Sequence, residues 1–399
     1  MQTKTLLSLS AWGVLAGAMA LVSCSSEASL SRSEFDTLSA QFLNERKAQL
    51  AQSLAQEWNA HEWTNGEYRM KFWDTIYGPT EVPAGGRSLY ISLHGGGGAP
   101  AEVNDQQWEN QKVLYTPAEG LYFVPRSPTD TWNMWHQEYM DEFLRKTIAA
   151  AVVFEGVNPD KVYILGYSAG GDGLYQMAPR MADHWAAASM MAGHPGDARM
   201  ESLRNLPFAI YMGGQDAAYD RNLLAQKYSS ILDSLATADG KGGYIHDTHI
   251  YDDCGHWMLR RDTIAIPWMA QYTRNVSPKR VVWVQDDVLR NNFYWLGVPD
   301  EARKQGATVA VEIDGQTLRI DTCDVPVLLV GLNDDLLNLD EPVTVVMGDQ
   351  TITTERFTRK APSAAQLLNP SPYSLDTPYP VVLQITQDAQ TGAVTVKER

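Results

Sequence analysis

A serine flanked by glycines marks the point of this chain at which a nucleophile is most readily built. The segment Gly166-Tyr167-Ser168-Ala169-Gly170 follows the apolar run Lys161–Leu165 and precedes a stretch with helical spacing. A sharp turn from strand to helix needs small residues beside the nucleophile, because neighbouring segments pass close to its backbone. The turn also places the next N–H group at a helix N-terminus, where negative charge is stabilised. We therefore predict Ser168 as a nucleophile and Ala169 as an oxyanion donor, with a structural serine in a glycine-rich turn as the alternative.

A second glycine-rich segment, His94-Gly95-Gly96-Gly97-Gly98, follows the apolar run Ser88–Leu93. Glycines have no side chains to cover their N–H groups, so these groups are free to donate to an oxyanion. We predict that the N–H groups of Gly96 and Gly97 complete the oxyanion hole. A flexible surface loop is the competing interpretation.

Together these segments resemble the α/β-hydrolases, and more narrowly their esterase, feruloyl esterase and polyhydroxybutyrate depolymerase branch. The resemblance covers residues 66–275 and depends on the two glycine-rich segments and on a later Gly255-His256-Trp257. It implies a mostly parallel sheet with helices on both faces and the hydrolysis of carboxylic esters through an acyl-enzyme, with no cofactor and no metal. It also implies the chain order nucleophile, acid, histidine.

That chain order selects one histidine and one acid from the sequence. Seven of the eight histidines either precede the expected acid or fall inside an expected strand: His61, His94, His136, His184, His194, His246 and His249. The last two lie in the strand expected over Tyr244–Tyr251, and His256, in the loop after this strand, is the predicted base. Asp216 leaves the apolar run Pro207–Met212 through Gly213-Gly214, which resembles the acid position of the family, and Asp220 is the substitute candidate.

The resemblance gives each of these side chains a role in catalysis. His256 removes the proton of Ser168 as it attacks, and later donates it to the leaving alkoxide. Asp216 fixes the tautomer of the imidazole and stabilises the imidazolium. Because this mechanism needs a neutral imidazole, we expect the activity to decline in acid.

Two further sets of side chains have alternative roles. Flat rings stack on both acyl groups and sugars, so three tryptophans are candidates for a substrate pocket, with burial in the core as the alternative: Trp132, Trp135 and Trp257. Cys254 and Cys323 could form a disulfide in an oxidising compartment or stay reduced. The sequence does not distinguish these states.

The N-terminus resembles a bacterial lipoprotein signal. Lys4 provides a positive charge, Leu6–Ala20 is an apolar stretch, and Leu21-Val22-Ser23-Cys24 follows it. We predict that residues 1–23 are a signal peptide and that Cys24 is acylated, so that the exported protein is anchored to a bacterial membrane. Ser25, in place of an aspartate, favours the outer membrane, and an ordinary secretory signal is the alternative.

Composition excludes several classes of protein. The chain has 399 residues with 32 basic and 48 acidic side chains, a formal net charge of −16, which disfavours binding to nucleic acid. Its three cysteines, without a Cys-x-x-Cys pair, disfavour a disulfide framework or a zinc finger. The sequence does not indicate an oligomeric state.

The elements expected around these residues divide the chain into three parts. Ser31 and Glu34 predict a capping box at the start of a long amphipathic helix over residues 33–60, within an N-terminal segment over 24–65. Residues 66–275 alternate apolar runs with helical patterns, including helices over Trp135–Phe154 and Trp257–Tyr272, with loops over 100–116 and 127–135. Residues 276–399 contain short strands with hairpin turns at Asp314-Gly315 and Gly348-Asp349, which predicts a β-rich accessory domain.

We therefore predict a lipid-anchored serine hydrolase of carboxylic esters, with feruloyl or acetyl esters of polysaccharides as candidate substrates. A serine peptidase is one alternative, because the same fold hosts amide hydrolysis. The other is a non-catalytic surface lipoprotein that binds carbohydrate or mediates adhesion. The presence of every expected triad and oxyanion residue disfavours this last possibility.

Overall fold

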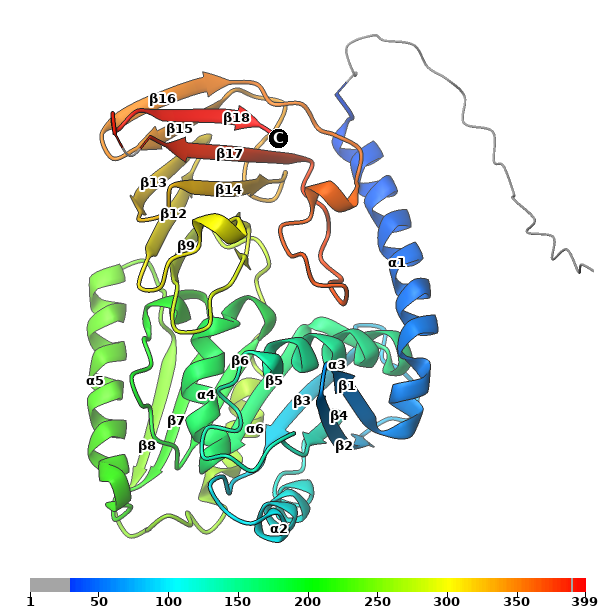
Figure 1. Cartoon of the computed structure of the whole chain (residues 1–399), viewed down its shortest axis with the longest axis vertical. Coiled ribbons are helices and arrows are strands. Elements are labelled where there is room, and N and C mark those ends of the chain that lie inside the picture. Colours follow the sequence, from blue (N-terminus) through cyan, green and yellow to red (C-terminus); the bar gives the residue numbers. More distant parts are fainter. Residues whose placement is uncertain (1–28, 389) are drawn as a thin grey trace, which may run out of the picture.

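The computed structural model describes residues 29–388 and 390–399, which fold around one large sheet and two smaller ones (Figure 1). In spatial order the large sheet contains β1 (Glu62–Asn65), β2 (Tyr68–Tyr77), β4 (Gly120–Pro125), β3 (Arg87–Leu93), β5 (Val157–Tyr167), β6 (Ala187–Met191), β7 (Phe208–Gly213) and β8 (His246–Tyr251). The pairings β1–β2 and β2–β4 are antiparallel, and all the others are parallel. The expected mostly parallel sheet is confirmed.

Helices cover both faces of this sheet because its central strands are apolar on both sides. Along β3, Leu89 and Ile91 point into one core and Tyr90 into the other, since successive side chains of a strand alternate. The first core is closed by α1 (Arg32–Ala60), α3 (Tyr139–Glu155), α4 (Ala169–Arg180) and α5 (Arg221–Asp239). The second core packs against α2 (Ala101–Lys112) and α6 (Ala265–Met269).

The C-terminal part consists of two five-stranded sheets, which confirms the expected β-rich architecture. One contains β10 (Asn292–Phe293), β11 (Leu296–Gly297), β14 (Val327–Leu332), β17 (Val381–Gln387) and β18 (Val394–Glu398). The other contains β16 (Gln350–Glu355), β15 (Val343–Met347), β13 (Thr317–Cys323), β12 (Thr308–Asp314) and β9 (Arg280–Val284). Both expected hairpins form, with Gly315 at φ 58° and Gly348 at φ 56° in their turns.

Six short 3-10 helices complete the described elements. They are η1 (Ala182–His184), η2 (Glu201–Asn205), η3 (Ala218–Asp220), η4 (Arg261–Ile264), η5 (Asp300–Ala302) and η6 (Ala364–Gln366).

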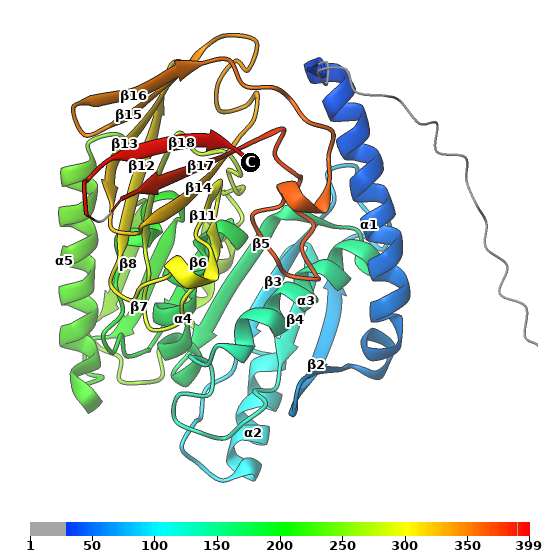
Figure 2. The same cartoon turned by 45° about the horizontal axis from the view of Figure 1, so that its top comes forward.

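Helix α1 runs alongside both parts of the molecule (Figures 1 and 2). Its predicted capping box is present, because the Ser31 hydroxyl accepts from the N–H of Glu34 and the Glu34 carboxylate accepts from the N–H of Ser31. Near its first turn, Arg32 pairs with Asp335 of the C-terminal part at 2.9 Å. Near its end, Trp58 is buried in the core of the large sheet. At 29 residues, or about 44 Å, the helix is long enough to brace both parts.

Three expected elements differ in the structure. The helix expected over Trp135–Phe154 is α3, which begins only at Tyr139. The helix expected over Trp257–Tyr272 is reduced to η4 and α6, because Leu259 and the residue after it have φ of 55° and 63°, which a right-handed helix cannot contain. The loop expected over residues 100–116 contains α2, whose many polar residues gave little apolar periodicity.

A buried ion network joins the helices of the large sheet to the C-terminal part. Asp141 on α3 pairs with Arg180 on α4 at 2.7 Å, and lies 3.4 Å from Arg290, between β9 and β10. Burial alone would raise the pKa of Asp141, but the two guanidinium groups hold it below its usual value. The predicted domain boundary at 275/276 falls between α6 and β9, and the division into a catalytic and an accessory domain stays a prediction.

Candidate active site

The predicted nucleophile lies at the turn between β5 and α4. Ser168 has φ 56° and ψ −120°, a conformation rarely adopted by residues other than glycine, and its N–H donates to the carbonyl of Met191 at 2.9 Å. A side chain at Gly170 would clash with the carbonyl of Leu93 at the end of β3. The glycine therefore allows the turn to pack against the neighbouring strand, and the strained turn presents Ser168 at the ends of the parallel strands.

The structure brings the three predicted catalytic side chains into one hydrogen-bonded line. The Oγ of Ser168 lies 2.9 Å from Nε2 of His256, and Nδ1 of His256 lies 2.7 Å from Oδ2 of Asp216. A carboxylate can only accept, so an imidazole that donates from Nδ1 to Asp216 keeps Nε2 as the acceptor for the Ser168 hydroxyl. This arrangement can remove a proton from the serine oxygen as it attacks a carbonyl carbon. The substitute acid, Asp220, is exposed at the start of α5.

Two neighbouring strand ends bring the acid and the histidine together. Asp216 follows β7, and His256 follows β8, which pairs with β7 in parallel. The loops after these strands are hydrogen-bonded to each other, because the N–H of Gln215 donates to the carbonyl of Cys254 at 2.9 Å. Asp216 is fixed further by its own carbonyl, which accepts from the N–H of Asn222 at the start of α5. Parallel pairing thus explains how residues 40 positions apart meet.

The oxyanion prediction needs one correction, at Gly97. The N–H of Ala169 lies in the first turn of α4, where no intrahelical acceptor is available, so it is free to donate. The N–H of Gly97, by contrast, already donates to Oδ1 of the buried Asn104 at 2.8 Å. Gly96 carries no such bond among the described residues and has φ 104°, so it is the better second donor. This role of Asn104 is not visible in the sequence, because residues 100–116 are expected to form a loop and the polar α2 shows little apolar periodicity.

His94 is a structural anchor of the glycine loop. Its Nδ1 lies 2.6 Å from the carbonyl of Gly95, and the N–H of Ser127 donates to its Nε2 at 3.1 Å, which requires a neutral ring with its proton on Nδ1. Burial lowers the pKa of His94 to about 4, although the bond to Gly95 acts in the opposite direction. Trp135 is fully buried and donates from Nε1 to the carbonyl of His94 at 3.0 Å. Trp135 therefore supports the loop, and the expectation that it lines a substrate pocket is wrong.

The other two tryptophans lie on the surface close to the triad. Trp132 is 68 % exposed, and its carbonyl oxygen lies 3.1 Å from the place that a Cβ would take at Gly97. Trp257 follows His256 directly, is 48 % exposed and packs on Tyr167 with a ring separation of 5.8 Å. A substrate can therefore reach both rings, and their role in binding stays a prediction.

The remaining expectations concern the cysteines, a metal and the N-terminus. Cys254 is buried, Cys323 is partly buried, and both are free. Within residues 29–388 and 390–399, no three His, Cys, Asp or Glu side chains are placed to hold a metal ion, and no helix there is long and apolar enough to cross a membrane. Cys24 and the predicted signal lie outside the described residues.

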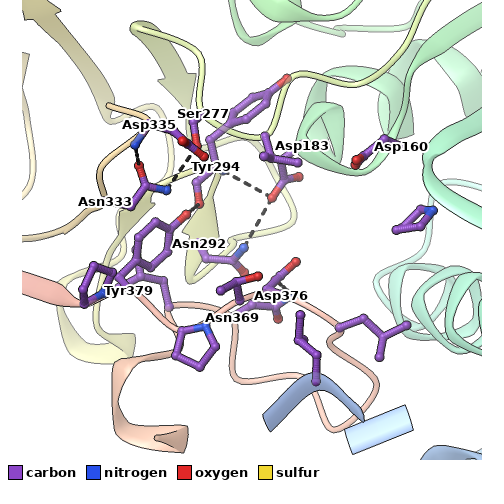
Figure 3. Close-up of a pocket in the computed structure, with 18 of the residues that line it drawn as sticks. Asp160, Asp183, Ser277, Asn292, Tyr294, Asn333, Asp335, Asn369, Asp376 and Tyr379 are labelled. Carbon is purple, nitrogen blue, oxygen red and sulfur yellow. Dashed lines mark hydrogen bonds between the residues drawn. The ribbon is translucent and has the colours of Figure 1, made fainter. Parts of the chain in front are cut away.

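A cavity of about 340 Å³ lies away from the triad, where α1, the large sheet and the C-terminal part meet (Figure 3). Its wall carries several carboxylates that already have partners. Asp183 accepts from Asn292 and from the N–H of Tyr294, and Asp160 pairs with Arg274 at 2.8 Å. These contacts connect the parts of the molecule and do not indicate a ligand.

The strand order of the large sheet and the turn that carries Ser168 define an α/β-hydrolase fold. No protein-family profile and no curated protein sequence matches the chain. Among solved structures it is similar to a thermostable esterase, with 17 % identity and a TM-score of 0.42 over 53 % of this chain and 62 % of that one, less than two thirds of its length. It is also similar to a ferulic acid esterase, with 14 % identity and a TM-score of 0.33 over 51 % of this chain and 97 % of that one. A third similar structure is a serine-to-alanine mutant of the feruloyl esterase module from Clostridium thermocellum, complexed with sinapinate. It has 14 % identity and a TM-score of 0.36 over 54 % of this chain and 88 % of that one.

Proposed function

We propose that this protein is a serine hydrolase that cleaves carboxylic esters through an acyl-enzyme. The observation that carries the proposal is the line from Ser168 through His256 to Asp216, with separations of 2.9 and 2.7 Å. Each member of the line comes from a different strand end, so only the fold brings them together.

The reaction follows from this geometry. As Ser168 Oγ attacks the ester carbonyl, its proton passes to Nε2 of His256, and the imidazolium is stabilised by Asp216. The carbonyl oxygen becomes an oxyanion that the N–H groups of Ala169 and Gly96 bind, each donor contributing about 3 kcal/mol. When the carbon–oxygen bond to the alcohol breaks, His256 returns the proton to the leaving alkoxide. Water, activated by the same imidazole, then hydrolyses the acyl-enzyme.

The openness of the site supports esters borne on a large molecule, such as feruloyl or acetyl groups of a polysaccharide. The imidazole of His256 is 44 % exposed, and the exposed rings of Trp132 and Trp257 adjoin the glycine loop and the histidine loop. Such rings stack on aromatic acyl groups and on sugars. The N-terminal pattern that ends at Cys24 supports export and lipid anchoring, which would place the enzyme at a bacterial outer membrane.

Hydrolysis of short p-nitrophenyl esters tests the proposal. The purified protein should release p-nitrophenol and react covalently with a fluorophosphonate probe, and the Ser168→Ala variant should do neither. Equal rates for the two proteins would remove Ser168 from the mechanism. Faster cleavage of peptide amides than of esters would favour a peptidase, and a folded protein that neither labels nor hydrolyses would favour a non-catalytic role.

Substrate class and anchoring need separate measurements. Feruloylated, acetylated and polyester substrates should be compared, and release of ferulate or acetate from a polysaccharide is expected to exceed cleavage of the polyester. Expression in a bacterium with a labelled fatty acid should label the full chain, whereas the Cys24→Ser variant should stay unlabelled. Equal labelling of both would disprove acylation at Cys24.

A further inference from the structure

Tyr167, the residue before the predicted nucleophile, is hydrogen-bonded to the loop that carries the predicted base. Its hydroxyl donates to the carbonyl of His256 at 2.6 Å and accepts from the N–H of Met258 at 3.1 Å. These groups belong to the peptide bonds before and after Trp257, so one hydroxyl holds the chain on both sides of that residue. A role for Tyr167 is not visible in the sequence, because the Gly-x-Ser-x-Gly motif allows any residue at this position.

The ring of Tyr167 also limits where the imidazole can lie. Its centroid is 6.0 Å from that of His256, with the ring planes at 81°, an edge-to-face arrangement. The ring of Tyr167 also packs on that of Trp257, with 5.8 Å between the two ring centroids. Tyr167 is therefore in contact with the backbone and with the side chain of the segment that it holds.

The surroundings keep the Tyr167 hydroxyl in its protonated, donating form. Tyr167 is buried in the aromatic core that packs against α2 and α6, together with Met258 and Cys254. Burial raises the pKa of Tyr167 well above its usual value, although the bond from Met258 acts in the opposite direction. The loop itself needs such support, because Leu259 and the residue after it have left-handed backbone conformations and no regular helix follows them directly.

We propose that Tyr167 is a positioning residue that ties the His256 loop to the nucleophile turn, so that Ser168 Oγ and His256 Nε2 keep their distance during turnover. The proposal rests on the proposed function, since it concerns the same triad. Ser168 and Tyr167 are consecutive on one strained turn, whereas His256 comes from a loop 88 residues later. The hydroxyl is a direct link between these two segments, and a displacement of about 1 Å at such a point costs roughly a hundredfold in rate.

The Tyr167→Phe variant tests this role because it keeps the ring and removes only the hydroxyl. We expect kcat on a p-nitrophenyl ester to fall about 10- to 100-fold with little change in KM, since the hydroxyl is already bonded to two backbone groups of the loop. The second-order rate of labelling by a fluorophosphonate should fall in parallel. Titration of active sites with the same probe and a thermal unfolding curve would restrict the comparison to folded protein.

Tyr211→Phe is the matched control. Tyr211 is fully buried in the same aromatic core, but its hydroxyl has no hydrogen-bond partner among the described residues, so its removal should leave kcat unchanged. The low-field NMR signal of the His256 Nδ1 proton should broaden in Tyr167→Phe and persist in Tyr211→Phe, a change that loss of stability alone would not produce.

The proposal is overturned if folded Tyr167→Phe keeps the wild-type kcat, if only its KM changes, or if both variants lose activity equally. Failure of the proposed function is a separate result, because it appears in the wild-type protein as absence of ester hydrolysis and of labelling. In that case the NMR signal still reports whether Tyr167 positions His256.

Discussion

Asp216 and His256 are joined by a hydrogen bond of 2.7 Å and differ greatly in exposure. The carboxylate is 3 % exposed and the imidazole 44 %. The buried partner is held by backbone bonds at the start of α5, so it acts as a fixed support. The exposed partner turns its free nitrogen toward Ser168 and the solvent. This asymmetry suits a site in which the acid never moves and the base exchanges a proton with substrate.

Asp216→Asn should leave the fold intact and lower kcat by about 10⁴-fold, because an amide no longer selects the imidazole tautomer that accepts from Ser168. Ester hydrolysis at neutral pH measures this effect. Asp220→Asn is the matched control, since that carboxylate is exposed and should be dispensable. A large loss in the control with a small loss at Asp216 would reassign the acid.

Gly96→Ala should lower kcat by about 10²- to 10³-fold, the usual consequence of losing one oxyanion donor. A methyl group at this position would clash with Oδ1 of Asn104, which holds the N–H of Gly97, so the loop must move. Gly98→Ala shares the strain of a positive φ, but its methyl would meet its first neighbour at an ordinary 3.5 Å. Steady-state kinetics should therefore separate the two variants, and equal losses would contradict an oxyanion role for Gly96.

The triad could be predicted because Ser168 and Asp216 follow strongly apolar strands, and the chain order of the family then selected His256. The strand before His256, β8, is rich in polar residues and only partly buried, so its own pattern was a weaker signal. Ser168, Asp216 and His256 could be placed at strand ends, and parallel strand ends meet at one edge of a sheet. Helix α1 could also be predicted, from a different signal: the capping box formed by Ser31 and Glu34 is local in the sequence.

Long-range side-chain contacts could not be read in this way. Whether the N–H of Gly97 is free depends on Asn104, which lies on a helix with almost no apolar periodicity. Trp135 and Trp132 lie three positions apart in similar surroundings, yet one is fully buried and the other is mostly exposed. The residue types do not show which of the two tryptophans is buried, because the burial of Trp135 depends on its packing against His94 and α4.

Acidification from pH 6.5 to about 4 should destabilise the protein through His94, whose pKa is lowered from 6.5 to about 4 by burial. Between these values the unfolded chain binds a proton that the folded chain does not, so stability falls as the pH falls. The shift corresponds to roughly 3 kcal/mol, and urea unfolding measured across this range would detect it. His94→Gln should reduce the slope by about half, because burial also lowers the pKa of His136 to about 4 and that contribution remains. An unchanged slope in that variant would contradict the assignment.

Below that range a second loss of stability should come from Asp141. Because its folded-state pKa is held below the usual value by Arg180 and Arg290, it stabilises the folded protein above the ordinary aspartate pKa, and this contribution is lost as the pH falls toward the folded-state value. At neutral pH, Asp141→Asn should cost about 3 to 5 kcal/mol, because two buried guanidinium groups lose their counter-charge. Asp335→Asn removes an exposed pair with Arg32 and should cost about 1 kcal/mol or less. Urea unfolding of the two variants measures these costs. An equal loss of unfolding free energy in Asp141→Asn and Asp335→Asn would show that the buried network stabilises the protein no more than the exposed pair does.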